Sequence, residues 1–179
     1  VLCLDRAGIV GEDGPTHQPI EQEAQIRLLE HLKNHNGERS MVVLRPGDGA
    51  ETVEAWRLAM EQQRPVAMIT SRQNIKDLPA QSDRRKEAEG LRKGGYVVWD
   101  SPEAKAVLIA SGSEVSTLVE GAELLAAEGI GVRIVSVPSE GLFRDQSKEY
   151  QRSVLPEGLP RYGMTAGLPV TLEGLVGEN

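Results

Sequence analysis

The densest group of reactive side chains lies in residues 5–18, which read Asp5-Arg6-Ala7-Gly8-Ile9-Val10-Gly11-Glu12-Asp13-Gly14-Pro15-Thr16-His17-Gln18. Three acids, an arginine and a histidine stand among three glycines, directly after an apolar stretch. Glycine loses the most backbone freedom on folding, and neighbouring carboxylates repel one another, so stability alone does not favour this composition. An imidazole has a pKa suited to proton transfer near neutral pH, and arginine binds anions. A ligand-binding loop would explain the segment.

A second polar group, Ser71-Arg72-Gln73-Asn74, follows the apolar residues 65–70. A planar guanidinium such as that of Arg72 can bind a phosphate through two donors and stays charged at physiological pH. The alternative is a structural ion pair between Arg72 and a carboxylate of this acidic chain. Arg45, which follows another apolar stretch, is expected to be structural.

Alternating strands and helices are expected to position these two groups. The predicted order is a strand at residues 1–4, a helix at 20–32, a strand at 41–44, a helix that begins at Asp48 with Glu51 at capping-box spacing, and a strand at 65–70. Strands joined by helices are expected to lie parallel, so the loops after the first and third strands should leave the same edge of one sheet. Ligands bind at that edge in open parallel sheets, which predicts a shared site.

The same strand and helix pattern returns in the second half of the chain. Strands are predicted at residues 96–99, 106–110 and 132–137, with a helix at 113–128 that ends at Gly129. The charged and glycine-rich residues 75–95 suit a solvated linker. We therefore expect an α/β fold with two units, residues 1–89 and 90–179.

Apolar residues at helical spacing predict which face of each helix is apolar. The expected apolar positions are Ile20, Ala24, Leu28 and Leu32 in the first helix, Val53, Trp56 and Met60 in the second, and Val115, Leu118, Val119, Ala122 and Leu125 in the third. Trp56 and Trp99 are interpreted as core residues. His31 and His35 are expected to be exposed, and no metal site is expected in the chain.

Composition excludes several classes of function. The 179 residues suffice for one sizeable core or two small ones. The formal charge of −7 argues against nucleic acid as a partner. The single Cys3 cannot form an internal disulfide, and no apolar run approaches the roughly 20 residues that cross a bilayer. We expect a soluble cytoplasmic protein with no membrane contact.

The segment from Gly11 to Pro19, Gly-Glu-Asp-Gly-Pro-Thr-His-Gln-Pro, resembles the active-site loop of the transketolase family. The resemblance continues in the same order through Leu44-Arg45-Pro46, Ser71-Arg72-Gln73-Asn74, Gly94-Gly95-Tyr96-Val97, Ala110-Ser111-Gly112-Ser113-Glu114-Val115, Val137-Pro138-Ser139 and Ser153-Val154-Leu155-Pro156. It implies two three-layer α/β units with mostly parallel sheets, part of a pyrimidine-binding domain followed by part of a C-terminal domain. The implied activity is transfer of a two-carbon ketol unit from a ketose phosphate to an aldose phosphate in the pentose phosphate pathway.

The resemblance also assigns roles to individual residues. It implies that His17 hydrogen-bonds the reacting ketose oxygens and assists proton transfer, and that Asp13 accepts a hydrogen bond from a substrate hydroxyl. It implies that Arg72, in the segment with Ser71, binds the substrate phosphate. The alternatives are a surface imidazole for His17 and a backbone cap of its own glycine-rich turn for Asp13.

The start of the loop departs from the family pattern. Transketolases usually carry His-Asp-Ser-Ile where this chain has Asp5-Arg6-Ala7-Gly8, and Asp5 cannot bind a phosphate as that histidine does. The run is instead similar to 1-deoxyxylulose-5-phosphate synthase, a related enzyme that joins pyruvate to glyceraldehyde phosphate, and there Arg6 would supply the positive charge. A third interpretation is a non-catalytic module that binds a sugar phosphate or a partner subunit.

The resemblance finally implies thiamine diphosphate with Mg²⁺ as cofactors and a homodimer of the complete enzyme. The groups that bind the cofactor and metal are expected upstream of Val1. The chain is therefore interpreted as an internal piece of a longer enzyme, inactive alone, with a naturally split subunit as the alternative.

Overall fold

The computed structural model describes residues 1–4 and 17–177. The first unit contains the elements β1 (Leu2–Leu4), α1 (Gln22–His31), β2 (Val42–Leu44), α2 (Gly49–Glu61) and β3 (Val66–Ile69). Its sheet has the strand order β1-β3-β2, and both strand pairs are parallel, as expected for strands joined by helices.

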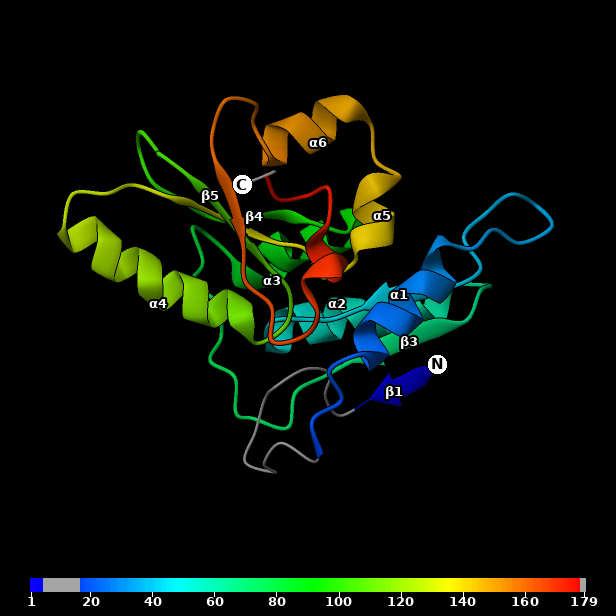
Figure 1. Ribbon diagram of the computed structural model, residues 1–179. Helices are drawn as coiled ribbons and strands as arrows, with labels where there is room; N and C mark the ends of the chain where they lie inside the picture. Colours follow the sequence, from blue (N-terminus) through cyan, green and yellow to red (C-terminus); the bar gives the residue numbers. More distant parts are fainter. Residues whose placement is uncertain (5–16, 178–179) are drawn as a thin grey trace.

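Helices cover both faces of this first sheet (Figure 1). On one face, α2 packs through Ala55, Leu58 and Ala59 against alternate residues of β2 and β3. On the other face, Ile26 of α1 packs against Val43 and neighbouring strand residues. The alternation of strand side chains between faces thus produces a three-layer arrangement, as the fold class predicted.

The second unit contains the elements β4 (Tyr96–Asp100), β5 (Val107–Ala110), α4 (Glu114–Ala127), β6 (Arg133–Ser136), α5 (Glu140–Arg144), α6 (Lys148–Val154), β7 (Arg161–Gly163) and the 3₁₀ helix η3 (Pro169–Leu172). The strand order is β4-β6-β5-β7; β4 is antiparallel to β6, and the other pairs are parallel. Mostly parallel sheets are therefore confirmed for both units.

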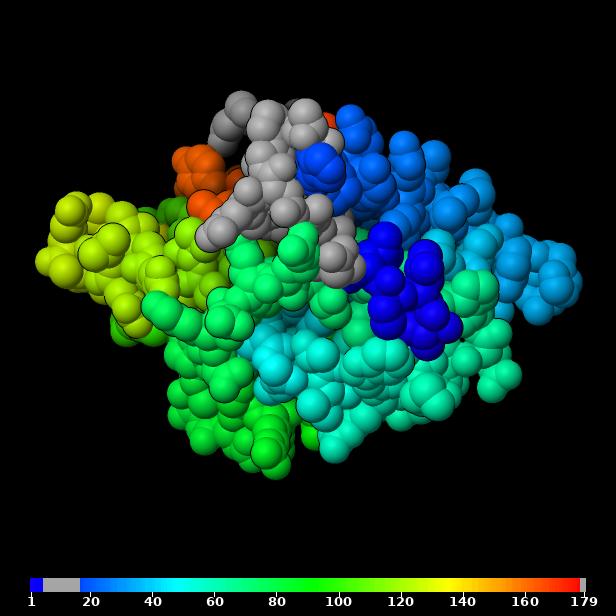
Figure 2. All heavy atoms as spheres, turned by 90° about the horizontal axis from the view of Figure 1, so that it is seen from below, coloured from blue at the N-terminus to red at the C-terminus, as the bar shows by residue number. Residues whose placement is uncertain are grey.

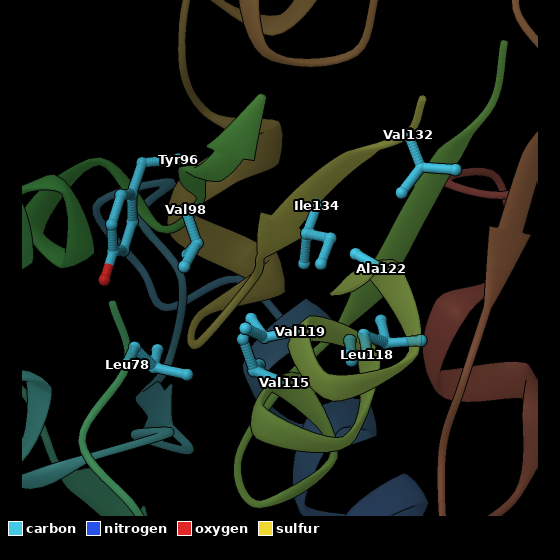
Figure 3. Packing of buried hydrophobic residues seen from close by; sticks show 10 residues of the cluster. Leu78, Tyr96, Val98, Val115, Leu118, Val119, Ala122, Val132 and Ile134 are labelled. Atoms are coloured by element: carbon cyan, nitrogen blue, oxygen red, sulfur yellow. The ribbon is translucent and has the colours of Figure 1, made fainter. Parts of the chain in front are cut away.

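Two layers of helix also enclose the second sheet. Val115, Leu118, Val119 and Ala122 of α4 point at one face, toward Val98 and Ile134 (Figure 3), which confirms the predicted inward stripe of this helix. The helices α5 and α6 lie on the opposite face (Figure 1), and their residues Phe143 and Val154 pack with Ile109 and Val135. Gly129 has φ +74° and directly follows Glu128, the C-cap residue of α4, so the helix stops where the sequence predicted.

The segment at residues 75–95, predicted as a solvated linker, has many exposed residues but is partly helical and partly buried. The segment contains α3 (Arg84–Ala88) and the 3₁₀ helix η2 (Glu89–Lys93), with Leu78, Ala88 and Leu91 buried. Arg84 Nε donates to Asp48 Oδ2 at 2.6 Å, which ties the segment to the start of α2. Some of the charge in this stretch, that of Arg84 and Arg92, therefore serves contacts with the first unit.

The predicted apolar faces of α1 and α2 do not face the core. Leu28 and Leu32 are 64% and 52% exposed, and Trp56 and Met60 are 42% and 77% exposed, so the assignment of Trp56 to the core is wrong. These helices bury charged residues instead: Glu23, Arg27 and Glu30 in α1, and Glu51 and Glu54 in α2. The physical reason is that the buried carboxylates find partners: Glu30 accepts from the Val43 backbone N of β2, Glu51 accepts from Tyr96 and Ser136 of the second unit, and Glu23 and Glu54 accept from arginines.

None of the helices in the described part of the chain has the length and apolarity to span a membrane. The first four residues (dark blue) lie at the surface in Figure 2.

Candidate functional site

The carboxyl ends of β1 and β3 lie side by side. Leu4 pairs with Ile69 in register, and both the backbone N and Oγ1 of Thr70 donate to the Leu4 carbonyl oxygen at 2.9 Å. The segments that follow these two strands therefore leave the sheet at the same edge, as expected from the parallel arrangement.

The structure describes three of the five predicted site residues. His17 is exposed shortly before α1, and Arg72 is exposed after β3. Ser71 is half-buried, and its Oγ accepts a hydrogen bond from the backbone N of Gln73 at 3.1 Å. Arg6 and Asp13 lie outside the described residues, as does Asp5, so their placement stays a prediction.

The segment after β3 contacts the start of α4. A cavity of about 290 Å³ is lined by Gln73 and Asn74 from the first unit and by Ser113, Ser116 and Thr117 from the second. Its volume is at the lower end of the range typical of small-ligand sites. Sequence reasoning missed the contribution of α4, because no local pattern says that this helix begins beside residues 71–74.

Arg45 fills the space between the two sheets at the same edge. It is buried, and its Nη2 donates to both carboxylate oxygens of Glu114 at 2.8 and 2.9 Å. Its Nη1 donates to the Ser111 carbonyl at 3.2 Å and lies 3.5 Å from Glu23 Oε2. Its backbone N also donates to the Pro138 carbonyl at 2.8 Å. These contacts agree with the expected structural role.

The turn formed by Ser111, Gly112 and Ser113 holds this guanidinium. Gly112 has φ +65°, and a Cβ at this position would lie 2.8 Å from Arg45 Nε, so both the turn and the close approach require glycine. Ser113 stands at the N-cap position, but its Oγ donates to Glu114 Oε2 at 2.9 Å instead of capping the helix. The turn therefore holds an arginine and its carboxylate partner.

A second buried polar group joins α2 to the other sheet. Asp48 Oδ1 accepts from the Glu51 backbone N at 2.7 Å, which confirms the predicted cap. Glu51 Oε1 accepts from Tyr96 OH at 2.6 Å and from Ser136 Oγ at 2.9 Å. Burial raises the pKa of Glu51, although hydrogen bonds from Tyr96 and the Gly47 backbone oppose the shift.

Tyr96→Phe is expected to destabilise the fold by about 1–3 kcal/mol, because Glu51 and Arg84 both lose a buried hydrogen-bond partner. Tyr162→Phe is the matched control, since Tyr162 is 53% exposed and its hydroxyl makes no hydrogen bond with the described residues. Urea unfolding of both variants measures the difference. Equal midpoints for the two variants would contradict a stabilising role for the Tyr96 hydroxyl.

Among the residues that the structure describes, no group of three His, Cys, Asp or Glu side chains is arranged to hold a metal ion. His31 and His35 are both exposed, as expected.

Comparison with known proteins assigns each unit to a domain family. Residues 1–77 match the family described as "Transketolase, pyrimidine binding domain", and residues 94–179 match "Transketolase-like TK C-terminal domain". The plasmid-encoded transketolase of Cupriavidus necator is 42% identical over 99% of this chain and 25% of its own length. The chain thus spans about a quarter of the length of that relative.

Solved structures show the same relationship. The transketolase of Campylobacter jejuni superposes with a TM-score of 0.79 and 36% identity, over 95% of this chain and 24% of the other. A structure titled "Split gene transketolase, inactive beta4 tetramer" superposes with a TM-score of 0.54 and 28% identity, over 76% of this chain and 39% of the other.

Proposed function

Because this chain belongs to the transketolase family, we propose that it supplies the substrate-binding part of an enzyme that transfers a two-carbon ketol unit from a ketose phosphate to an aldose phosphate. The observation that carries the proposal is the parallel pairing of Leu4 with Ile69. It starts the segments that lead to His17 and Arg72 from one sheet edge, which supports a shared site for a single substrate.

In this proposal each side chain has a separate task. Arg72, with Ser71 beside it, binds the phosphate of the sugar, because a guanidinium matches phosphate geometry through two donors. His17 donates to the reacting oxygens and exchanges a proton with them near neutral pH. Asp13 accepts a hydrogen bond from a substrate hydroxyl, and Arg6 adds positive charge where the family usually has histidine.

The family relationship supports thiamine diphosphate with Mg²⁺ as the cofactors. Thiamine diphosphate, when bound, supplies the carbon nucleophile and stabilises the two-carbon unit. We propose that the groups that hold it lie outside this chain, and that the chain alone is inactive. The inactive tetramer named for the split transketolase supports this, as a related chain without activity.

The exposed apolar faces of α1 and α2 support a larger assembly. Leu28, Leu29 and Leu32 form one such face, and Val53, Trp56 and Met60 form the other. Contiguous apolar surface commonly marks a contact with another protein surface. We propose that these faces pack against the rest of a homodimeric cytoplasmic enzyme of the pentose phosphate pathway, with the unit boundary of this chain between residues 89 and 90.

Ketol transfer from xylulose 5-phosphate to ribose 5-phosphate, with thiamine diphosphate and Mg²⁺, tests the proposal. The chain is assayed joined to the cofactor-binding segment of its own enzyme, and alone as the control. Transfer by the joined protein but not by the chain alone is expected. Absence of transfer in both, with sugar phosphate binding that does not depend on cofactor, would favour a non-catalytic module.

A second candidate reaction rests on the run Asp5-Arg6-Ala7-Gly8. It is similar to 1-deoxyxylulose-5-phosphate synthase, so the same protein is also given pyruvate and glyceraldehyde 3-phosphate. Release of CO₂ with formation of a five-carbon product, in the absence of ketol transfer, would move the assignment to that enzyme.

A further inference from the structure

A cavity of about 330 Å³ in the second unit has four cationic side chains among its ten lining residues. It lies between α5, α6, the start of β7 and the segment after η3. Its charged lining residues are Arg144, Lys148, Arg152, Arg161 and a single acid, Glu157. In a chain with a formal charge of −7, this concentration of positive charge is unusual.

Three elements, α5, α6 and β7, place these cationic residues around the cavity. Arg144, Lys148 and Arg152 follow one another at four-residue intervals along α5 and α6. Arg161 opens β7, where it pairs in register with Val107 of β5. Its Nη2 donates to the Leu155 and Pro156 carbonyls at 2.9 and 3.2 Å, which fixes one edge of the guanidinium.

Protein carboxylates balance only part of this charge. Neither Lys148 nor Arg161 makes an ion pair with a carboxylate of residues 1–4 or 17–177. Arg152 pairs with Glu157 at 2.8 Å, but the two side chains are 64% and 72% exposed, and such surface pairs contribute little. Arg144 pairs with the buried Glu140. Lys148 and Arg161 therefore keep positive charge without a carboxylate partner among the described residues, and a bound anion would offset it.

We propose that this cavity binds a small molecule that carries a phosphate group. Guanidinium and ammonium groups together suit a dianionic phosphate, and Phe143, Leu155 and Leu175 form an apolar side that can contact the rest of the molecule. In Figure 1 the cavity elements α5 and α6 lie on the far side of the second sheet from α4. The site therefore lies away from the carboxyl edge of β1 and β3 and does not rest on the proposed function.

Titration of the full chain with inorganic phosphate, ribose 5-phosphate and AMP, followed by NMR at low ionic strength, tests the site. Shifts of the backbone signals of Lys148, Arg152 and Arg161 report this cavity, separately from shifts at residues 71–74. Saturable shifts at the cavity are expected with the phosphate-bearing probes and not with unphosphorylated ribose. The probe with the lowest Kd indicates whether a sugar or a base beside the phosphate adds to binding.

Variants then test which side chains bind. Lys148→Ala and Arg152→Ala each remove an exposed cation, so neither should unfold the chain, and each is expected to raise the Kd about 3–10-fold. Lys105→Ala is the matched control, an exposed lysine between β4 and β5, and should leave the Kd unchanged. No saturable shift at the cavity, or equal Kd values for Lys148→Ala and Lys105→Ala, would overturn the proposal.

Discussion

Arg45→Met is expected to destabilise the fold by about 3–5 kcal/mol, the range for removing one partner of a buried ion pair. The loss of stability comes from the buried carboxylates that Arg45 leaves without their partner. Glu114 and Glu23 are both buried, and the methionine offers them no donor. The Ser111 carbonyl also loses its hydrogen bond from Arg45. Equilibrium unfolding in urea measures the change through the midpoint at constant slope.

Arg57→Met is the matched control, because Arg57 also pairs with a glutamate, Glu54, but is 64% exposed. A change below about 0.5 kcal/mol is expected there. In the double variant Arg45→Met with Glu114→Gln, the loss should be smaller than the sum of the two single losses, since the neutral amide no longer leaves an uncompensated charge. Strict additivity would show that the two residues do not act as a pair.

Arg72→Ala is expected to lower kcat/KM for a phosphorylated acceptor by about 100-fold, which corresponds to about 2.7 kcal/mol of binding to the phosphate. The prediction rests on the proposed function and uses the joined, cofactor-loaded enzyme. Glyceraldehyde 3-phosphate and unphosphorylated glyceraldehyde are compared as acceptors. The loss should be confined to the phosphorylated sugar, because only that substrate offers the anion that Arg72 is proposed to bind.

Arg85→Ala serves as the control for this experiment, since Arg85 is an exposed arginine of α3. It should leave both acceptors unchanged. Equal losses with both acceptors after Arg72→Ala would show that Arg72 supports the structure of the loop and does not select phosphate. Retention of full activity would exclude it from the site.

The sequence predicted the strand and helix order because local patterns determine it. Asp48 with Glu51 predicted where α2 begins, and the structure shows the corresponding hydrogen bond. The stripe of Val115, Leu118, Val119 and Ala122 predicted the buried face of α4. Asp48 and Glu51 lie within one turn of the same helix. The stripe of α4 packs on an apolar sheet, so its period alone predicted the buried face.

The predictions for α1 and α2 were wrong because helical period alone does not say which surface covers a helix. In α2 the face toward the second unit carries Glu51, whose partners Tyr96 and Ser136 come from two strands far along the chain. A charged residue was therefore buried while Trp56 and Met60 stayed exposed. No single-helix pattern contains that information.

The candidate site was predictable in part for the same reason. Parallel strands are a local consequence of strand and helix alternation, so the common edge for the two motif segments followed from the sequence. The contact of residues 71–74 with α4, and the position of Arg45 beside Gly112, depend on how the two units pack. The roles of Arg6, Asp13, His17, Ser71 and Arg72 in binding remain predictions.

The position of Arg45 between the sheets has a consequence for how the chain comes apart. Each unit has its own apolar core, which would ordinarily let two domains melt independently. Separation of the units, however, would break the buried hydrogen bonds of Arg45 with Glu114 and of Tyr96 with Glu51. That penalty links the two cores thermodynamically, so the chain should lose its structure in one cooperative transition, as a single folding unit.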